Sequence, residues 1–155
     1  MEKRELMEAS LRLMRLSAAA YVTTIDGRGN PVTRAMLNLR NRGDYPKLVR
    51  FFAAQKPEFV AYFTTSTASE KLSHIKKHPY VSVYYCDPAK YHGLMLGGEM
   101  QIIDDLKIKK ELWQKGWEQY YPGGFDDPDH TVLKLVPTVA RGWYKGATFA
   151  FSLKK

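Results

Sequence analysis

Cysteine and long apolar runs are the scarcest features of this sequence. Among 155 residues there is one cysteine, Cys86, so the chain cannot form a disulfide within itself. No apolar run approaches the roughly 20 residues that a membrane-spanning helix needs. The opening residues MEKRELMEAS also lack the apolar centre of a secretory signal. These scarcities favour a reducing cytoplasm as the location and no membrane partner.

Familiar fingerprints of nucleotide binding and hydrolysis are missing as well. The sequence contains no G-x-G-x-x-G run, no P-loop and no G-x-S-x-G elbow. His74 and His78 lie four residues apart, but no carboxylate stands nearby at metal-ligand spacing, which favours a solvated helix face over a metal site. Cys86 is interpreted as a small buried strand residue rather than a nucleophile. We therefore expect no metal.

What is present indicates a globular chain with many strands. Hydrophobic residues make up 45% and charged residues 26%, which argues against disorder. The aromatic share of 13% favours pleated, half-buried surfaces. The net charge is +8, with lysines and arginines scattered along the chain. That charge fits a nucleic acid, a phosphorylated small molecule or solubility alone.

Helical and extended patterns alternate along the chain. From Glu2 to about Leu16, apolar residues recur at helical spacing between charges, which predicts an amphipathic helix. Strands at Ala20–Ile25 and Val32–Leu39 flank the turn-forming residues 26–31 and predict a hairpin. The next expected elements are a short helix within 47–52, a strand at Phe59–Thr64, a helix at Ser69–Lys77 capped by Ser69, and strands at Tyr80–Cys86 and Tyr91–Ile103, the last with a bulge at Gly97-Gly98.

The remaining third of the sequence predicts one helix and the closing strands. Asp104 or Asp105 is expected to cap a helix that includes Leu112 and Trp117 and ends at Pro122-Gly123-Gly124. The strands expected after it are Thr131–Val136, Ala140–Tyr144 and a short one at Ala147–Leu153. Antiparallel neighbours on short connections favour a barrel over a doubly wound sheet. The chain is thus predicted to be one α+β, mainly β domain spanning 1–155.

Two segments carry the groups that an anion needs. Arg34 lies on the second strand, and residues 63–71 run from a strand through a hydroxyl-rich turn into a helix N-terminus. Such an N-terminus offers free N–H groups and the positive end of the helix dipole. Lys71 would add a point charge and Arg34 a planar fork. The alternative, a Ser/Thr-rich turn that caps an ordinary helix beside a solvated Arg34, stays open on these residues alone.

The order of several motifs resembles the pyridoxamine 5′-phosphate oxidase-like superfamily of FMN-binding split barrels, and within it the general stress protein branch. The residues that carry the likeness are Arg34 after a Gly-Asn-Pro turn, Phe63-Thr64-Thr65 to Ser69-Glu70-Lys71, His78 to Val83, Gly97 to Met100, Leu112-Trp113, Tyr121 to Gly124, Asp126-Asp127-Pro128 and Ala140 to Trp143.

The resemblance implies a six-stranded antiparallel split β-barrel with flanking helices, and a homodimer with an FMN site at each subunit interface. It implies that Arg34 and Lys71 bind the FMN phosphate with help from Ser69, while Thr64 and Thr65 line the phosphate and ribityl side. Backbone groups of Ala35, Met36 and Leu37 would meet the ring edge, and Trp143 would approach from the partner chain.

Several positions depart from the vitamin-processing oxidase. Leu39 stands where that enzyme has a lysine for its substrate's phosphate, and Tyr144-Lys145-Gly146 follows Trp143 without an Arg-x-His pair. Its serine-rich substrate helix is missing, since Glu111 to Gln114 lies there instead. Glu70 replaces a flavin-contacting arginine, and Gly93 replaces a glutamine. Pyridoxamine phosphate oxidation is therefore not expected.

Three function classes remain open from the sequence. The first is an FMN-dependent oxidoreductase whose substrate is unknown. The second is a stress protein that binds a flavin, a deazaflavin or haem without turnover. The third is a basic nucleic-acid-binding barrel that uses Tyr84, Tyr85 and Tyr91 near Lys90 as stacking platforms.

Overall fold

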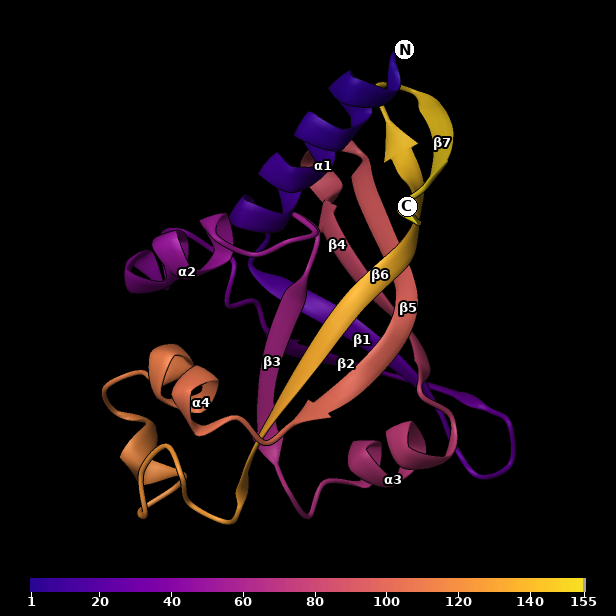
Figure 1. The fold of residues 1–155 in the computed structure, drawn as a ribbon. Helices are drawn as coiled ribbons and strands as arrows, with labels where there is room; N and C mark the ends of the chain where they lie inside the picture. Colours follow the sequence, from indigo (N-terminus) through magenta and orange to yellow (C-terminus); the bar gives the residue numbers. More distant parts are fainter. Residues whose placement is uncertain (155) are drawn as a thin grey trace.

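A curved antiparallel sheet organises the chain. The computed structural model describes residues 1–154, and the sheet has the strand order β2-β1-β4-β5-β6-β3, with β7 paired to β6 (Figure 1). The strands are β1 (Ala19–Ile25), β2 (Pro31–Leu37), β3 (Ala61–Ser66), β4 (Tyr80–Asp87), β5 (His92–Ile103), β6 (His130–Tyr144) and β7 (Ala147–Ser152). Across the described residues, β2 and β3 end the order and lie near each other without a ladder between them. The barrel is therefore split at this point.

Helices close the ends and one side of the sheet. They are α1 (Lys3–Leu16), α2 (Val49–Ala53), α3 (Glu70–Lys77) and α4 (Leu106–Leu112), with short 3-10 turns η1 (Pro46–Leu48), η2 (Pro88–Lys90) and η3 (Trp117–Gln119). In Figure 1, α1 lies at the end near β7, α3 lies at the opposite end, and α2 and α4 flank β3. The predicted first helix, first hairpin and mid-chain helix are confirmed. No helix within residues 1–154 has the length and apolarity to cross a bilayer.

Two apolar clusters pack on opposite faces of β3. Phe63 joins Met14 of α1 and Val83 of β4 inside the barrel, whereas Tyr62 joins Phe52 of α2 on the other face. Successive strand residues point to opposite faces, so a strand covered on both sides needs a continuous apolar run. That requirement explains the unbroken apolar sequence from Phe59 to Phe63.

The predicted bulge at Gly97-Gly98 is confirmed, but the strand opposite it differs from expectation. The β5–β6 register shifts between these glycines, so that Gly97 pairs with Val139 and Gly98 with Pro137. Residues 130–144 therefore form one strand, not the two predicted around Pro137. A proline inside a strand is tolerated at a bulge, because the ladder is already interrupted there.

The strand count is seven rather than the six that the resemblance implies. The last two strands form a hairpin in which Tyr144 pairs with Ala147 across Lys145 and Gly146. Both turn residues have positive φ, at 49° and 77°. A two-residue turn of this kind matches the twist of the flanking strands, which allows β7 to extend the sheet beyond β6.

The helix after β5 is shorter than the sequence predicts. Asp105 caps it as expected, because its carboxylate accepts from the backbone N–H groups of Lys107 and Ile108. The helix ends at Leu112, however, and Trp117 lies in a separate 3-10 turn. Gly116 between them has a φ of 100°, a conformation that no helix interior contains. The prediction that one helix includes Trp117 and continues to Pro122 is therefore wrong.

Behind this turn lies a buried histidine. His130 is 1% exposed, and its ring lies 5.2 Å from Trp113 and 5.0 Å from Tyr121, between ring centroids. Its Nδ1–H donates to the Phe125 carbonyl at 2.8 Å, while Nε2 is buried with no partner in residues 1–154. Burial lowers the pKa of His130 below its ordinary value. The folded protein thus holds this ring neutral.

Acidification is expected to destabilise the protein through His130. Because its folded pKa is lowered, the unfolded chain binds the extra proton first as the pH falls below about 6.5. The stabilisation is complete above that pH and is lost below it, at up to about 1.4 kcal/mol per pH unit. Urea unfolding of the wild type and His130→Gln from pH 7.5 to 5 measures the difference in slope. The exposed His78→Gln variant is the control, and equal slopes for all three proteins would disprove the assignment.

Candidate phosphate-binding site

Two cationic side chains, Lys71 and Arg34, lie close to the turn that leads from β3 into α3. Lys71, in the first turn of α3, donates from Nζ to Thr65 Oγ1 and to Ser69 Oγ, both at 2.7 Å. Ser69 does occupy the N-cap position, but its side chain makes no capping bond to the helix, contrary to the prediction. The two hydroxyls instead hold the ammonium group in one place.

Arg34 reaches the same region from β2. Val22 is its cross-strand partner on β1, so its side chain lies on the inward face of the hairpin. Its Nη1 donates to Thr24 Oγ1 at 2.7 Å and to the Val32 carbonyl at 3.0 Å. Its Nη2 is buried and has no hydrogen-bond partner among the described residues. A buried donor without an acceptor is costly, so this nitrogen marks a place where an acceptor belongs.

The two cations are close enough to repel each other. Burial lowers the pKa of both groups, and the charge of Arg34 lowers the pKa of Lys71 further. The ion pairs within residues 1–154 are Arg4–Glu8 and Lys145–Glu5, so neither cation is paired with a carboxylate. Glu70 raises both pKa values from an exposed position in the first turn of α3. The site therefore combines two partly buried charges, two hydroxyls and one unsatisfied donor.

Thr24 and His74 also belong to this site, although the sequence did not predict them there. Thr24 is fully buried, and its hydroxyl lies 2.8 Å from His74 Nδ1 as well as 2.7 Å from Arg34 Nη1. Because a guanidinium only donates, the hydroxyl accepts from Arg34 and can donate its own O–H to His74 Nδ1. His74 is half-buried and belongs to this chain of contacts, so the solvated helix face predicted for it is wrong. The sequence did contain a signal for His74: it lies three residues after Lys71, and residues at that spacing lie on one face of a helix.

The other sequence candidates are divided between two surfaces. Thr65 faces inward and contacts Lys71, whereas Met36 faces inward and packs against the barrel core. Thr64 alternates with Thr65 along β3. Ala35 and Leu37 lie on the outer face, where Ala35 pairs with Tyr21. Trp143 also lies on the outer face, where it pairs with Gly93 and Thr148 and is 42% exposed. Within one chain, Trp143 is therefore not brought to Lys71.

Comparisons with known proteins agree with this architecture. The family described as "Pyridoxamine 5'-phosphate oxidase like" matches residues 23–155. A Clostridium acetobutylicum protein related to general stress protein 26 of B. subtilis, of the pyridoxinephosphate oxidase family, is 27% identical, with a TM-score of 0.76 over 99% of this chain and 97% of its own. General Stress Protein 26 from Bacillus anthracis is 16% identical, with a TM-score of 0.70 over 95% and 99%.

Two structures of lower similarity are named for other cofactors. An F420 reductase is 20% identical, with a TM-score of 0.55 over 83% of this chain and 93% of its own. A heme binding protein from Mycobacterium smegmatis is 13% identical, with a TM-score of 0.62 over 93% and 57%. No curated protein matches the sequence. With the family match over most of the chain, the split sheet and the motif order together, the chain belongs to the pyridoxamine 5′-phosphate oxidase like family.

Proposed function

We propose that this chain binds FMN and holds the phosphate between Arg34 and Lys71. The observation that carries the proposal is Arg34 Nη2, which is buried without an acceptor among residues 1–154 in a site whose other cation, Lys71, has no ion-pair partner there either. A phosphate dianion supplies acceptor oxygens and neutralises both charges at once. Thr65 and Ser69, which already hold the Lys71 ammonium, would share the phosphate and ribityl side with Thr64.

A second copy of the chain would complete the site. Large apolar side chains gather on the outer face of the sheet, where β-strand alternation exposes one set from each strand. They are Tyr21 of β1, Leu37 of β2, Tyr80 and Tyr84 of β4, and Trp143 of β6. An exposed apolar face of this kind is typical of a protein interface. In a homodimer, Trp143 of one subunit would wall the ring of an FMN held by Arg34 and Lys71 of the other.

The proposed activity is flavin-dependent oxidoreduction of a small molecule in the cytoplasm. Bound FMN supplies hydride exchange, and the chain supplies its position and electrostatics. Genuine pyridoxamine phosphate oxidation is disfavoured, because Leu39 is 1% exposed and packs in the core instead of presenting a cation. The nucleic-acid alternative loses one of its three stacking residues, since Tyr85 is fully buried.

Absorption spectroscopy of the isolated protein, with mass identification of the molecule released on denaturation, tests the cofactor. The expected result is a yellow protein that releases FMN in a ratio near one per chain. Release of a deazaflavin or of haem would replace FMN with the cofactor that the more distant folds carry. A colourless protein that FMN does not saturate would refute the proposal.

The interface makes a separate prediction. Tyr21→Glu places a charge at the middle of the outer face, where Tyr21 pairs with Ala35 and Tyr84. Burying that charge in a dimer is unfavourable, so sedimentation should change from dimer to monomer and FMN should bind more weakly. Tyr120→Glu changes an exposed tyrosine beside η3 and should leave both properties unchanged. A Tyr21→Glu variant that stays dimeric would place the interface elsewhere.

A further inference from the structure

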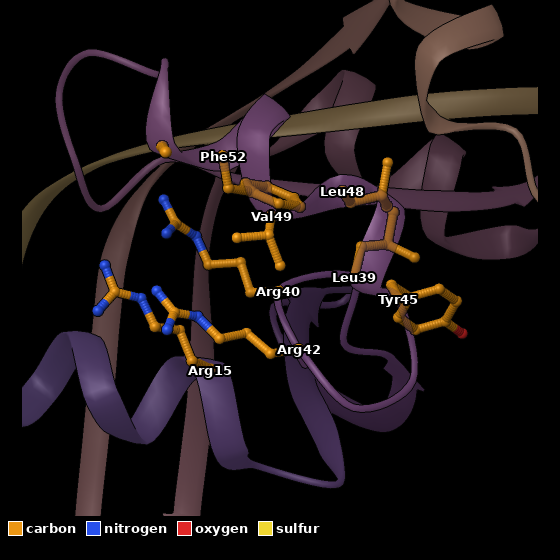
Figure 2. Close-up of a pocket in the computed structure, with 9 residues that line it drawn as sticks. Arg15, Leu39, Arg40, Arg42, Tyr45, Leu48, Val49 and Phe52 are labelled. Atoms are coloured by element: carbon orange, nitrogen blue, oxygen red, sulfur yellow. The ribbon is translucent and has the colours of Figure 1, made fainter.

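Three arginines converge between the end of α1 and the loop after β2. Arg15 comes from the last turn of α1, whereas Arg40 and Arg42 come from the loop that leads to η1. Figure 2 shows the three guanidinium groups extending to the same side of a small hollow. The backbone N–H of Arg42 donates to the Arg15 carbonyl at 3.1 Å, which ties the loop to the helix end.

Arg40 is the deepest of the three. It is 6% exposed, and its Nε and Nη2 donate to the Val60 carbonyl at 2.9 and 2.7 Å, with a further contact from Nη2 to the Glu58 carbonyl. The guanidinium also lies 4.7 Å from the centre of the Phe52 ring. These partners accept hydrogen bonds from Nε and Nη2 but carry no negative charge. Burial lowers the pKa of Arg40 to about 10.

The other two arginines increase the positive charge instead of neutralising it. Burial and the charge of Arg42 both lower the pKa of Arg15. Among residues 1–154 none of the three is ion-paired with a carboxylate, since the pairs there are Arg4–Glu8 and Lys145–Glu5. Glu58 acts on Arg15 and Arg40 only from beyond ion-pair distance. Buried charges in proteins are normally paired, so this cluster calls for an anion.

The hollow between them limits what can enter. Its volume is about 20 Å³, and Leu39, Tyr45 and Leu48 complete its wall. That space admits about one water-sized group. A single oxygen of an oxyanion fits, with the rest of the molecule outside, where the exposed Arg42 side chain can meet it.

We propose that Arg15, Arg40 and Arg42 bind the phosphoryl or carboxylate group of a small molecule, at a second anion site. The Val60 carbonyl contacts Arg40 of this site, and the Thr65 hydroxyl contacts Lys71 of the first site. The two residues are five positions apart along an extended segment, which corresponds to roughly 17 Å at about 3.3 Å per residue. One phosphoryl group cannot serve both sites. The second site does not depend on FMN binding.

Inorganic phosphate is the probe for this site, titrated calorimetrically at constant ionic strength. The titration uses the Arg34→Ala/Lys71→Ala protein, in which the first site no longer competes. Arg15→Gln and Arg42→Gln should each weaken phosphate binding roughly tenfold, because each removes one charged donor. The double variant should abolish binding. Arg50→Gln, an exposed arginine on α2 outside the hollow, is the matched control and should bind as the parent does.

Two outcomes overturn the second site. One is phosphate binding by the Arg15→Gln/Arg42→Gln protein that equals the parent's, and the other is an equal loss in Arg50→Gln, which would indicate diffuse surface charge. If a mixed-sequence oligonucleotide binds more tightly than phosphate with a steep salt dependence, the small-molecule ligand is also refuted. FMN titration of Arg15→Gln/Arg42→Gln in the wild-type background should give unchanged affinity, which separates this result from any failure at the FMN site.

Discussion

Lys71→Ala is expected to bind FMN roughly 10- to 100-fold more weakly than the wild type, and Arg34→Ala to show a loss of similar size. Hydrogen bonds to charged groups contribute about 1.5–3 kcal/mol, and each tenfold change in affinity corresponds to about 1.4 kcal/mol. With both cations removed, the loss should reach roughly a thousandfold or more. Fluorescence titration of FMN with the three variants measures these affinities.

Stability of the FMN-free protein distinguishes a binding role for Lys71 from a structural one. Lys71 and Arg34 repel each other, and Lys71 has no carboxylate partner in residues 1–154. The relief of this repulsion offsets the loss of its hydrogen bonds to Thr65 and Ser69, so Lys71→Ala should change the unfolding midpoint of the FMN-free protein little. Lys76→Ala, an exposed site on the same helix, is the control for FMN affinity. A Lys71→Ala protein that unfolds more readily yet binds FMN normally would show that the ammonium only supports the β3–α3 turn.

Gly142→Ala should be among the most destabilising single-methyl changes in the chain, at about 3 kcal/mol. A Cβ at this position of β6 would overlap the backbone oxygen of Gly93 on β5 and lie 3.0 Å from the Phe149 ring. Because the nearest atom belongs to the backbone, the strands themselves must move apart. The β5–β6 ladder also positions Trp143, which pairs with Gly93.

Urea denaturation of Gly142→Ala against the wild type measures this effect. Gly27→Ala is the matched control, since a Cβ there meets no atom within 4 Å and its turn lies at the surface. The control should remain within about 0.5 kcal/mol of the wild type. If Gly142→Ala were equally close to the wild type, the tight β5–β6 approach would be wrong.

The sequence predicted elements whose signals are local. The Asp26-Gly27 turn fixed the first hairpin, Asp105 capped α4, and paired glycines marked the β5 bulge. These features depend on residues close together in the chain. The predictions were wrong where residues distant in the chain determine the structure. At Pro137, where the sequence predicted a break between two strands, the strand continues because Pro137 lies opposite the β5 bulge.

The same distinction holds for the two cationic sites. Arg34 and Lys71 were identified because each lies in a motif, whereas Thr24 links Arg34 to His74 only through a cross-strand contact. Arg15 and Arg40 are 25 positions apart, and nothing local in the sequence relates them. Long-range pairing brings such residues together, and only the folded sheet reveals it.

The most direct test of the central claim compares the affinities of the wild-type protein for FMN and for riboflavin, which is the same ring and ribityl chain without the phosphate. If Arg34 and Lys71 hold the phosphoryl group, FMN should bind at least about a hundredfold more tightly, since two charged contacts are lost with riboflavin. The preference should disappear in Arg34→Ala/Lys71→Ala. Equal affinity of the wild type for both compounds would contradict the account.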